Sequence, residues 1–237
     1  MSVYNEKFRK VRRDYSPYLF HFIKGETSNP IETMTNILNE MKLKSGRGYI
    51  CFSASPLTSI VRFFETKVNR TGKSMYLPYG IGFSRDILVR DFGARNVIYY
   101  DDHEKDLIPK ELKWRALRLN VDTSDFEYLR EWRIKGEVFD FKDFSIEDII
   151  VVAPETNILN DLVVNHDVDI NLSSDDTEPD CEEVFRREWK GVAVNRVKDF
   201  MDDFAMSGSA ATQIIGQDML DELVASFPFY TGKKHSE

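Results

Sequence analysis

The sequence predicts an α+β fold, in which short strands form a sheet and helices pack against it around one core. Short apolar runs typical of strands recur along the first two thirds of the chain. Between them lie segments whose apolar residues have helical spacing. The chain has 237 residues, of which 42% are hydrophobic, and this is enough to bury a sizeable interior.

The first elements follow from local residue patterns. The apolar run from Tyr18 to Ile23 predicts a strand. Asn29, Pro30 and Glu32 predict the start of a helix, because Asn caps a helix, Pro suits its first turn and Glu reaches back to the cap. We expect this helix to run to about Leu43. Its expected buried stripe comprises Ile31, Met34, Ile37, Leu38 and Met41.

A second group of elements continues the pattern. A glycine-containing turn at residues 45 to 48 leads to a short strand at residues 49 to 53. Pro56 is expected to open another helix, whose apolar residues are Leu57, Ile60, Val61 and Phe64. Further strands are predicted at residues 79 to 83, 97 to 100, 126 to 138 and 149 to 152.

The segment Phe126 to Phe141 sets a carboxylate, Glu131, between Arg130 and Arg133. In a strand, Glu131 and Arg133 would lie on the same face. A carboxylate held beside guanidinium groups stays ionised at neutral pH, and this suits a residue that stabilises positive charge. A structural ion pair on a half-exposed strand is the alternative interpretation.

The organisation changes after Pro154. Asp180 and Glu183 form a second capping pair, which predicts an amphipathic helix carrying Phe185, Trp189, Val192, Val197, Phe200 and Phe204. One more helix is expected at residues 214 to 227, and a short basic helix at residues 4 to 14. The sequence thus predicts a core with a basic N-terminal helix at residues 1 to 165, an acidic loop or linker at 166 to 180, and a helical appendage at 181 to 237.

Charge is distributed unevenly along the chain. Residues 143 to 185 hold 13 of the 40 acidic residues and none of the 32 Lys and Arg residues, so the remainder is mildly basic. The acids concentrate at residues 173 to 183, which are expected to be a solvated linker or an electrostatic guard over an anion site.

Several protein classes are disfavoured by what the sequence lacks. Cys51 and Cys181 lie far apart in contrasting settings, which disfavours a disulfide framework. No signal core or membrane span is apparent, so we expect a soluble cytoplasmic protein. Common nucleotide-binding, hydrolase and metal motifs are absent, and we expect no metal site.

Five segments, taken in order, resemble the NAD-dependent ADP-ribosyltransferase fold. They are LFHFIKG, NILNEMKL, ICFSASPLTS, YLPYGIGFSRDILVRDFGARNVIYY, and FEYLREWR with DIIVVAPE after it. The likeness is greatest to the AbiGi-type families of prokaryotic abortive phage infection, which carry an EWR strand. SPLTS, at residues 55 to 59, is also similar to a motif of DarT-type transferases, which have an arginine where Leu57 stands here. The resemblance implies a split β-sheet core with flanking helices.

The resemblance also implies roles for individual residues. Glu131 would be the catalytic carboxylate, acting as the nicotinamide glycosidic bond of NAD breaks and positive charge builds on the ribose. The other residues would bind NAD, which is a substrate here and not a recycled cofactor. His21, with Phe22 beside it, would hold the ribose and adenine end, and Ser53 or Ser55 would lie near the nicotinamide amide. Tyr79 would stack on nicotinamide, and Arg130 or Arg133 would bind the pyrophosphate or orient Glu131.

The expected function is therefore a toxin-like ADP-ribosyltransferase that acts in phage defence and modifies a nucleic acid or a protein. An antitoxin protein is a further expected partner, and no membrane partner is expected. Two alternatives stay open: an NAD glycohydrolase that uses water as acceptor, and a catalytically silent binding or antitoxin module.

Overall fold

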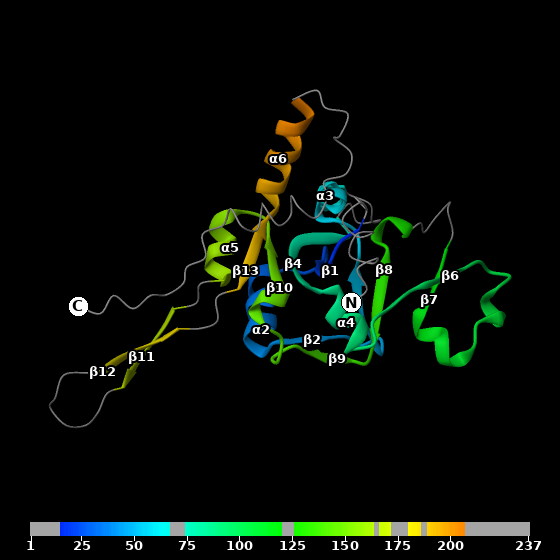
Figure 1. Ribbon diagram of the computed structural model, residues 1–237, viewed down its shortest axis with the longest axis horizontal. Helices are drawn as coiled ribbons and strands as arrows, with labels where there is room; N and C mark the ends of the chain where they lie inside the picture. The colour runs from blue at the N-terminus through cyan, green and yellow to red at the C-terminus, as the bar shows by residue number, and fades with distance from the viewer. Residues whose placement is uncertain are drawn as a thin grey trace, which may run out of the picture.

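The computed structural model describes residues 15–66, 74–119, 126–163, 166–171, 180–185 and 189–206. These residues form a mixed α+β structure around a seven-stranded sheet (Figure 1). The basic helix expected at residues 4 to 14, the helix expected at 214 to 227 and most of the acidic stretch lie outside the described residues. Within the described residues, no helix combines the length and apolar character that crossing a membrane requires.

The large sheet has the strand order β13-β10-β4-β1-β3-β8-β5. Its strands are β1 (Tyr18–Lys24), β3 (Tyr49–Ser53), β4 (Tyr76–Ser84), β5 (Arg95–Asn96), β8 (Glu131–Lys135), β10 (Ile149–Ala153) and β13 (Lys190–Ala193). Only the β10–β13 pair is parallel; all other neighbours are antiparallel. The strands expected near residues 18, 49, 79 and 149 are thereby confirmed, and β8 comes to lie next to β3.

Three small strand pairs form sheets of their own beside the large one. They are β2 (Lys42–Lys44) with β9 (Val138–Asp140), β6 (Ile98–Tyr100) with β7 (Ala116–Arg118), and β11 (His166–Asn171) with β12 (Asp180–Phe185). The segment from residue 98 to residue 119, which contains β6 and β7, holds no fully buried residue. We call it the β6–β7 segment. It also contains the short helices η2 (Lys105–Leu107) and η3 (Lys110–Arg115).

Helices cover both faces of the large sheet. One face packs against α2 (Pro30–Glu40), α4 (Arg85–Arg90) and α5 (Thr156–Val163), which bury Met34, Leu38, Leu88, Leu159 and Leu162. The other face packs against α3 (Leu57–Ile60), η1 (Val61–Phe64) and α6 (Val194–Met206). The short helices η4 (Glu127–Leu129) and η5 (Ile146–Asp148) precede β8 and β10. Each strand therefore carries two sets of side chains with different surroundings.

The capping pattern before α2 is confirmed. The Asn29 side chain accepts a hydrogen bond from the Glu32 amide at 3.2 Å and donates one to the Glu32 carboxylate at 2.7 Å. The expected end of this helix at about Leu43 is wrong, because Met41 adopts a left-handed conformation with φ 50° and β2 follows. Ile31 is also not part of the buried stripe, since 45% of its surface is exposed in the first turn.

The long strand expected at residues 126 to 138 is wrong. Residues 127 to 129 form η4, and Arg130 has a φ of 46°, which ends that turn before β8 begins at Glu131. Gly136, with a φ of 134°, then separates β8 from β9. Alternation still holds within β8, so Glu131 and Arg133 share a face as expected.

The helix expected to open at Asp180 is also wrong. Residues 180 to 185 form β12, which pairs with β11, so residues 166 to 171 are not a loop either. The chain next forms β13 at the sheet edge, and α6 begins only at Val194. Gly191 brings β13 so close to α5 that an added Cβ would lie 2.5 Å from a Leu159 methyl carbon. The proposed division into three parts remains a prediction, but β13 and α6 pack directly on the core.

Two glycines on β4 provide space for the aromatic rings of β1. A Cβ at Gly82 would lie 2.5 Å from Cε1 of Phe20, and one at Gly80 would lie 2.6 Å from Cδ1 of Phe22. Phe20 is 1% exposed, so its ring has little room to move. These glycines therefore serve close packing within the sheet.

We expect Gly82→Ala to lower the free energy of unfolding by about 1–3 kcal/mol, because the added methyl group overpacks the Phe20 ring. Urea denaturation measures this change. Gly46→Ala is the matched control, since an added Cβ there meets no atom within 4 Å. Equal stability of the two variants would contradict this packing.

Candidate active site

Glu131 is the first residue of β8, and contacts with the end of β3 fix its position. It lies opposite Ser53 in the strand register. The Ser53 hydroxyl donates a hydrogen bond to the Leu129 carbonyl at 2.7 Å, and the Ala54 amide donates to the carbonyls of Leu129 and Arg130. The end of β3 thus holds the turn at residues 129 and 130, which leads into β8. The position of the Glu131 carboxylate on the sheet is therefore fixed.

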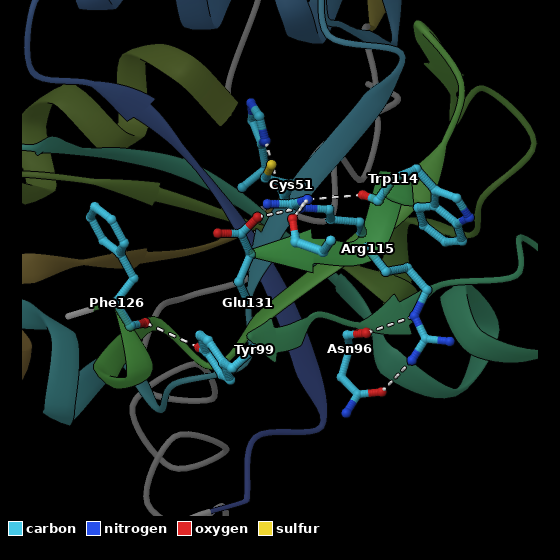
Figure 2. A network of polar contacts seen from close by, with 10 residues as sticks. Cys51, Asn96, Tyr99, Trp114, Arg115, Phe126 and Glu131 are labelled. Atoms are coloured by element: carbon cyan, nitrogen blue, oxygen red, sulfur yellow. Dashed lines mark hydrogen bonds and ion pairs between the residues drawn. The ribbon is translucent and has the colours of Figure 1, made fainter. Parts of the chain in front are cut away.

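Arg133 binds this carboxylate from the same face of β8. Its Nε donates to Oε1 of Glu131 at 2.7 Å, and only 4% of the Arg133 side chain and 11% of the Glu131 side chain are exposed. Nη1 of Arg133 also donates to the carbonyls of Trp114 and Ala116, at 2.8 and 3.1 Å. The guanidinium lies 4.2 Å from the centre of the Tyr49 ring. Arg133 therefore orients Glu131 and ties the β6–β7 segment to the sheet. Figure 2 shows Glu131 and Trp114 in this network.

The charge of Glu131 also changes the pKa of Arg133. Burial by itself would lower the pKa of the guanidinium, but the charge of Glu131 and the hydrogen bond to it outweigh burial and raise this pKa. The Arg133 guanidinium is therefore charged at every physiological pH.

Cys51 lies on the same face of the sheet as Glu131. It is opposite Arg133 in the register between β3 and β8. Burial, followed by the negative charge of Glu131, raises the pKa of the Cys51 thiol to about 12. The thiol is therefore protonated at neutral pH.

Two tyrosines complete what we call the carboxylate cluster, which comprises Cys51, Tyr76, Tyr128, Glu131 and Arg133. Burial raises the pKa of Tyr76, and the charge of Glu131 and the nearby Cys51 and Tyr128 add to the rise. The Tyr128 ring stacks on Phe63, with centroids 4.1 Å apart, and its hydroxyl donates to the Met75 sulfur. Both tyrosines are half-buried. The cluster therefore combines one carboxylate with hydroxyl groups and aromatic surface.

The two serines expected to bind NAD contact backbone groups in this structure. Ser55 is 2% exposed, and its hydroxyl donates to the Tyr128 carbonyl. Ser53 is 6% exposed and, besides donating to Leu129, accepts from the Ser55 amide at 3.2 Å. Both hydroxyls therefore hold η4 in place and support Glu131 indirectly.

The remaining expected residues are separated by the sheet. Phe22 lies on the same face as Glu131 but is 5% exposed and packed against Phe64 and Tyr76. His21 lies on the opposite face, where its ring contacts Phe52. Tyr79 belongs to that opposite core, and burial followed by the charge of Glu155 raises its pKa. Arg130 is exposed next to Glu131. The structure thus unites Glu131 and Arg133 near Ser53 but does not bring His21 or Tyr79 to them.

His21 is held as a neutral imidazole. Its Nδ1 donates to the Cys51 carbonyl at 2.8 Å. Burial lowers the pKa of His21 below its ordinary value of 6.5; the hydrogen bond opposes this shift, and the charge of Lys24 adds to it. The unfolded chain therefore takes up a proton at a higher pH than the folded protein does.

We expect the free energy of unfolding to fall as the pH drops below about 6.5, because His21 gains a proton on unfolding. His21→Gln should flatten this dependence, measured by urea denaturation between about pH 5 and pH 7.5. The control is His103→Gln, which changes an exposed histidine and should leave the slope as in the wild type. An unchanged slope in His21→Gln would show that His21 does not carry the effect.

Three residues of the carboxylate cluster were not predicted from the sequence: Cys51, Tyr76 and Tyr128. Alternation along β3 places Tyr49, Cys51 and Ser53 on one face, and this pattern could have identified Cys51 once β3 was paired with β8. Tyr76 and Tyr128 come from β4 and η4, and no local pattern connects them. No group of three or more potential metal ligands occurs in the part of the chain that the structure describes.

Comparisons with protein-family models, with curated proteins and with solved structures found no match for this chain.

Proposed function

We propose that this protein is an ADP-ribosyltransferase that breaks the nicotinamide glycosidic bond of NAD and transfers ADP-ribose to a macromolecule. The observation that carries the proposal is the placement of Glu131. It is a carboxylate fixed by the end of β3, ion-paired with Arg133, on the sheet face that also carries Tyr76 and Tyr128. The proposal includes an ADP-ribosyltransferase-like version of the sheet, in which β1, β3 and β8 are adjacent antiparallel strands.

The chemistry needs a fixed negative charge. As the bond between C1′ of the ribose and the nicotinamide nitrogen breaks, the electron pair leaves with nicotinamide and C1′ becomes positively charged. An ionised carboxylate held in place beforehand stabilises this charge without having to reorganise. An acceptor nucleophile then bonds to C1′ and loses its proton.

The geometry changes the roles that we propose for the arginine, tyrosine and histidine residues named from the sequence. Arg133 is buried and donates to protein oxygens, so its proposed role is to orient Glu131 and not to bind pyrophosphate. Tyr76 and Tyr128 lie on the Glu131 face and are better placed than Tyr79 to meet a flat ring. His21 has no role in this proposal, because it lies on the opposite face of the sheet.

A catalytically silent binding module is the second candidate, and one observation favours it. Arg133 joins Glu131 to the carbonyls of Trp114 and Ala116, as expected of a structural ion pair that anchors the β6–β7 segment. The place in phage defence and the antitoxin partner belong to the transferase proposal, and they rest on the family resemblance.

One experiment separates these candidates. The purified protein is incubated with NAD labelled in its adenylate part, together with RNA, DNA or a protein extract, and both nicotinamide release and label transfer are measured. Label on one polymer supports the transferase and identifies the acceptor class. Nicotinamide release without label indicates a glycohydrolase, and no turnover with any acceptor supports the binding module.

A further inference from the structure

The β6–β7 segment combines apolar composition with exposure. Nine of its 22 residues are large and apolar or aromatic, yet none of the 22 is fully buried. Leu107, with 77% of its surface exposed, is the most exposed large apolar residue in the part of the chain that the structure describes. β6 and β7 are also parallel, and parallel sheets normally have both faces covered. The segment is therefore typical of a surface that another molecule covers.

The segment lies at one side of the molecule, where Figure 1 shows β6 and β7 beyond β8 and away from α5 and α6. Arg133 attaches it to the sheet through the carbonyls of Trp114 and Ala116. Nε of Arg115 forms a second attachment by donating to the Asn96 carbonyl at 2.9 Å. These attachments use backbone carbonyls and one arginine, so most side chains of η2 and η3 stay accessible.

The charged residues of the segment are separated along the chain. Residues 101 to 106, the acidic half, contain four acidic residues and one lysine. Residues 110 to 118, the basic half, contain four basic residues and one glutamate. The segment as a whole is neutral, which disfavours a polyanion such as nucleic acid, because binding to phosphates requires an excess of positive charge. Two halves of opposite sign instead fit a partner that carries the same two halves.

We propose that the β6–β7 segment binds the same segment of a second copy of this chain about a twofold axis. In such an interface, a residue i of one copy contacts a residue j of the other, and j contacts i in return. The acidic half of each copy thus meets the basic half of the other, and the exposed apolar residues are buried between them.

The charged side chains of the segment divide into two sets. Asp102 and Arg118 form an ion pair within one chain, where it joins the two halves. Four exposed side chains are assigned to contacts between the copies: Glu104, Asp106, Lys110 and Lys113. The inference goes beyond the proposed function and does not depend on it.

Charge reversal tests the pairing of opposite halves. Wild-type protein at about 100 µM should sediment with twice the 27.6 kDa of one chain. Glu104→Lys with Asp106→Lys makes both halves positive, and Lys110→Glu with Lys113→Glu makes both negative. Each double variant should raise the Kd of the dimer about 100-fold or more, because like charges then face each other. An equimolar mixture of the two variants should restore the dimer, since positive halves again meet negative ones.

The matched control is Lys24→Glu with Lys135→Glu, which makes the same change of charge on exposed lysines outside the segment and should leave the dimer intact. Circular dichroism checks that every variant is folded. A monomeric wild type, double variants that remain dimeric, or a mixture of folded variants that stays monomeric would overturn the inference.

Hydrogen exchange of the wild type locates the contact without any substitution. Amides of residues 98 to 119 should exchange more slowly in the dimer than in protein diluted until it is monomeric, because a covered segment opens less often. Amides of β10 in the core should exchange at the same rate in both. A dimer whose protection lies outside residues 98 to 119 would place the interface on another face and contradict the proposal.

Discussion

Glu131→Gln is expected to lower nicotinamide release from NAD by about 100-fold or more, because the substitution removes the charge that stabilises the developing positive charge on the ribose. Gln keeps the size of Glu, and its amide oxygen can still accept the hydrogen bond from Nε of Arg133. The protein should therefore remain folded. Single-turnover assays of nicotinamide release measure the effect, and circular dichroism checks the fold.

The control for this prediction is Glu137→Gln, which removes one exposed negative charge from the turn after β8. It should release nicotinamide at the wild-type rate. Wild-type turnover in Glu131→Gln would remove Glu131 from the chemistry. An unfolded variant would instead assign it to the structural ion pair of the binding-module candidate.

Arg133→Met should cause the largest loss of stability, about 3–5 kcal/mol in the free energy of unfolding. The substitution leaves the Glu131 carboxylate, with 11% of its side chain exposed, without its positive partner. It also removes the donor to the Trp114 and Ala116 carbonyls. Urea denaturation measures the loss, and Arg130→Met, which changes the exposed arginine nearby, should cost less than about 1 kcal/mol.

A double-mutant cycle assigns this loss to the ion pair. Once Glu131→Gln has removed the negative charge, Arg133→Met should cost less than it does in the wild type, because no unpaired carboxylate remains. Equal costs in both backgrounds would mean that the carbonyl contacts, and not the ion pair, account for the stability.

Local patterns predicted those parts of the fold that local interactions determine. The Asn29–Glu32 cap and the strands β1, β3 and β10 follow from neighbouring residues, and each was found at its expected place. Phe185, Trp189 and Val192 have helical spacing, yet β12 and β13 form instead, since pairing with β11 and with β10 satisfies their backbone groups. A pattern within a short window of residues cannot predict pairing with a strand that is distant in the sequence.

The candidate site was predicted only in part for a similar reason. Glu131 and Arg133 are two residues apart, so their alternation sufficed to pair them. Placing His21 required knowledge of which face of β1 is the face that carries Glu131 on β8, two strands away, and this depends on the order and register of the whole sheet. The serines look like ligand donors in the sequence because nothing local shows that the Leu129 and Tyr128 carbonyls, more than 70 positions away, accept from them.

The hydrogen bonds of Arg133 differ in stability, because two of them are made to the β6–β7 segment. Residues 98 to 119 include no fully buried side chain, so local unfolding of this segment costs less free energy than opening the sheet. When it opens, Arg133 loses the Trp114 and Ala116 carbonyls but keeps its hydrogen bond to Glu131. Whatever binds to and orders the β6–β7 segment will therefore also narrow the range of orientations that Arg133, and with it the carboxylate, can sample. Ordering of the β6–β7 segment thus restricts the motion of the Glu131 carboxylate.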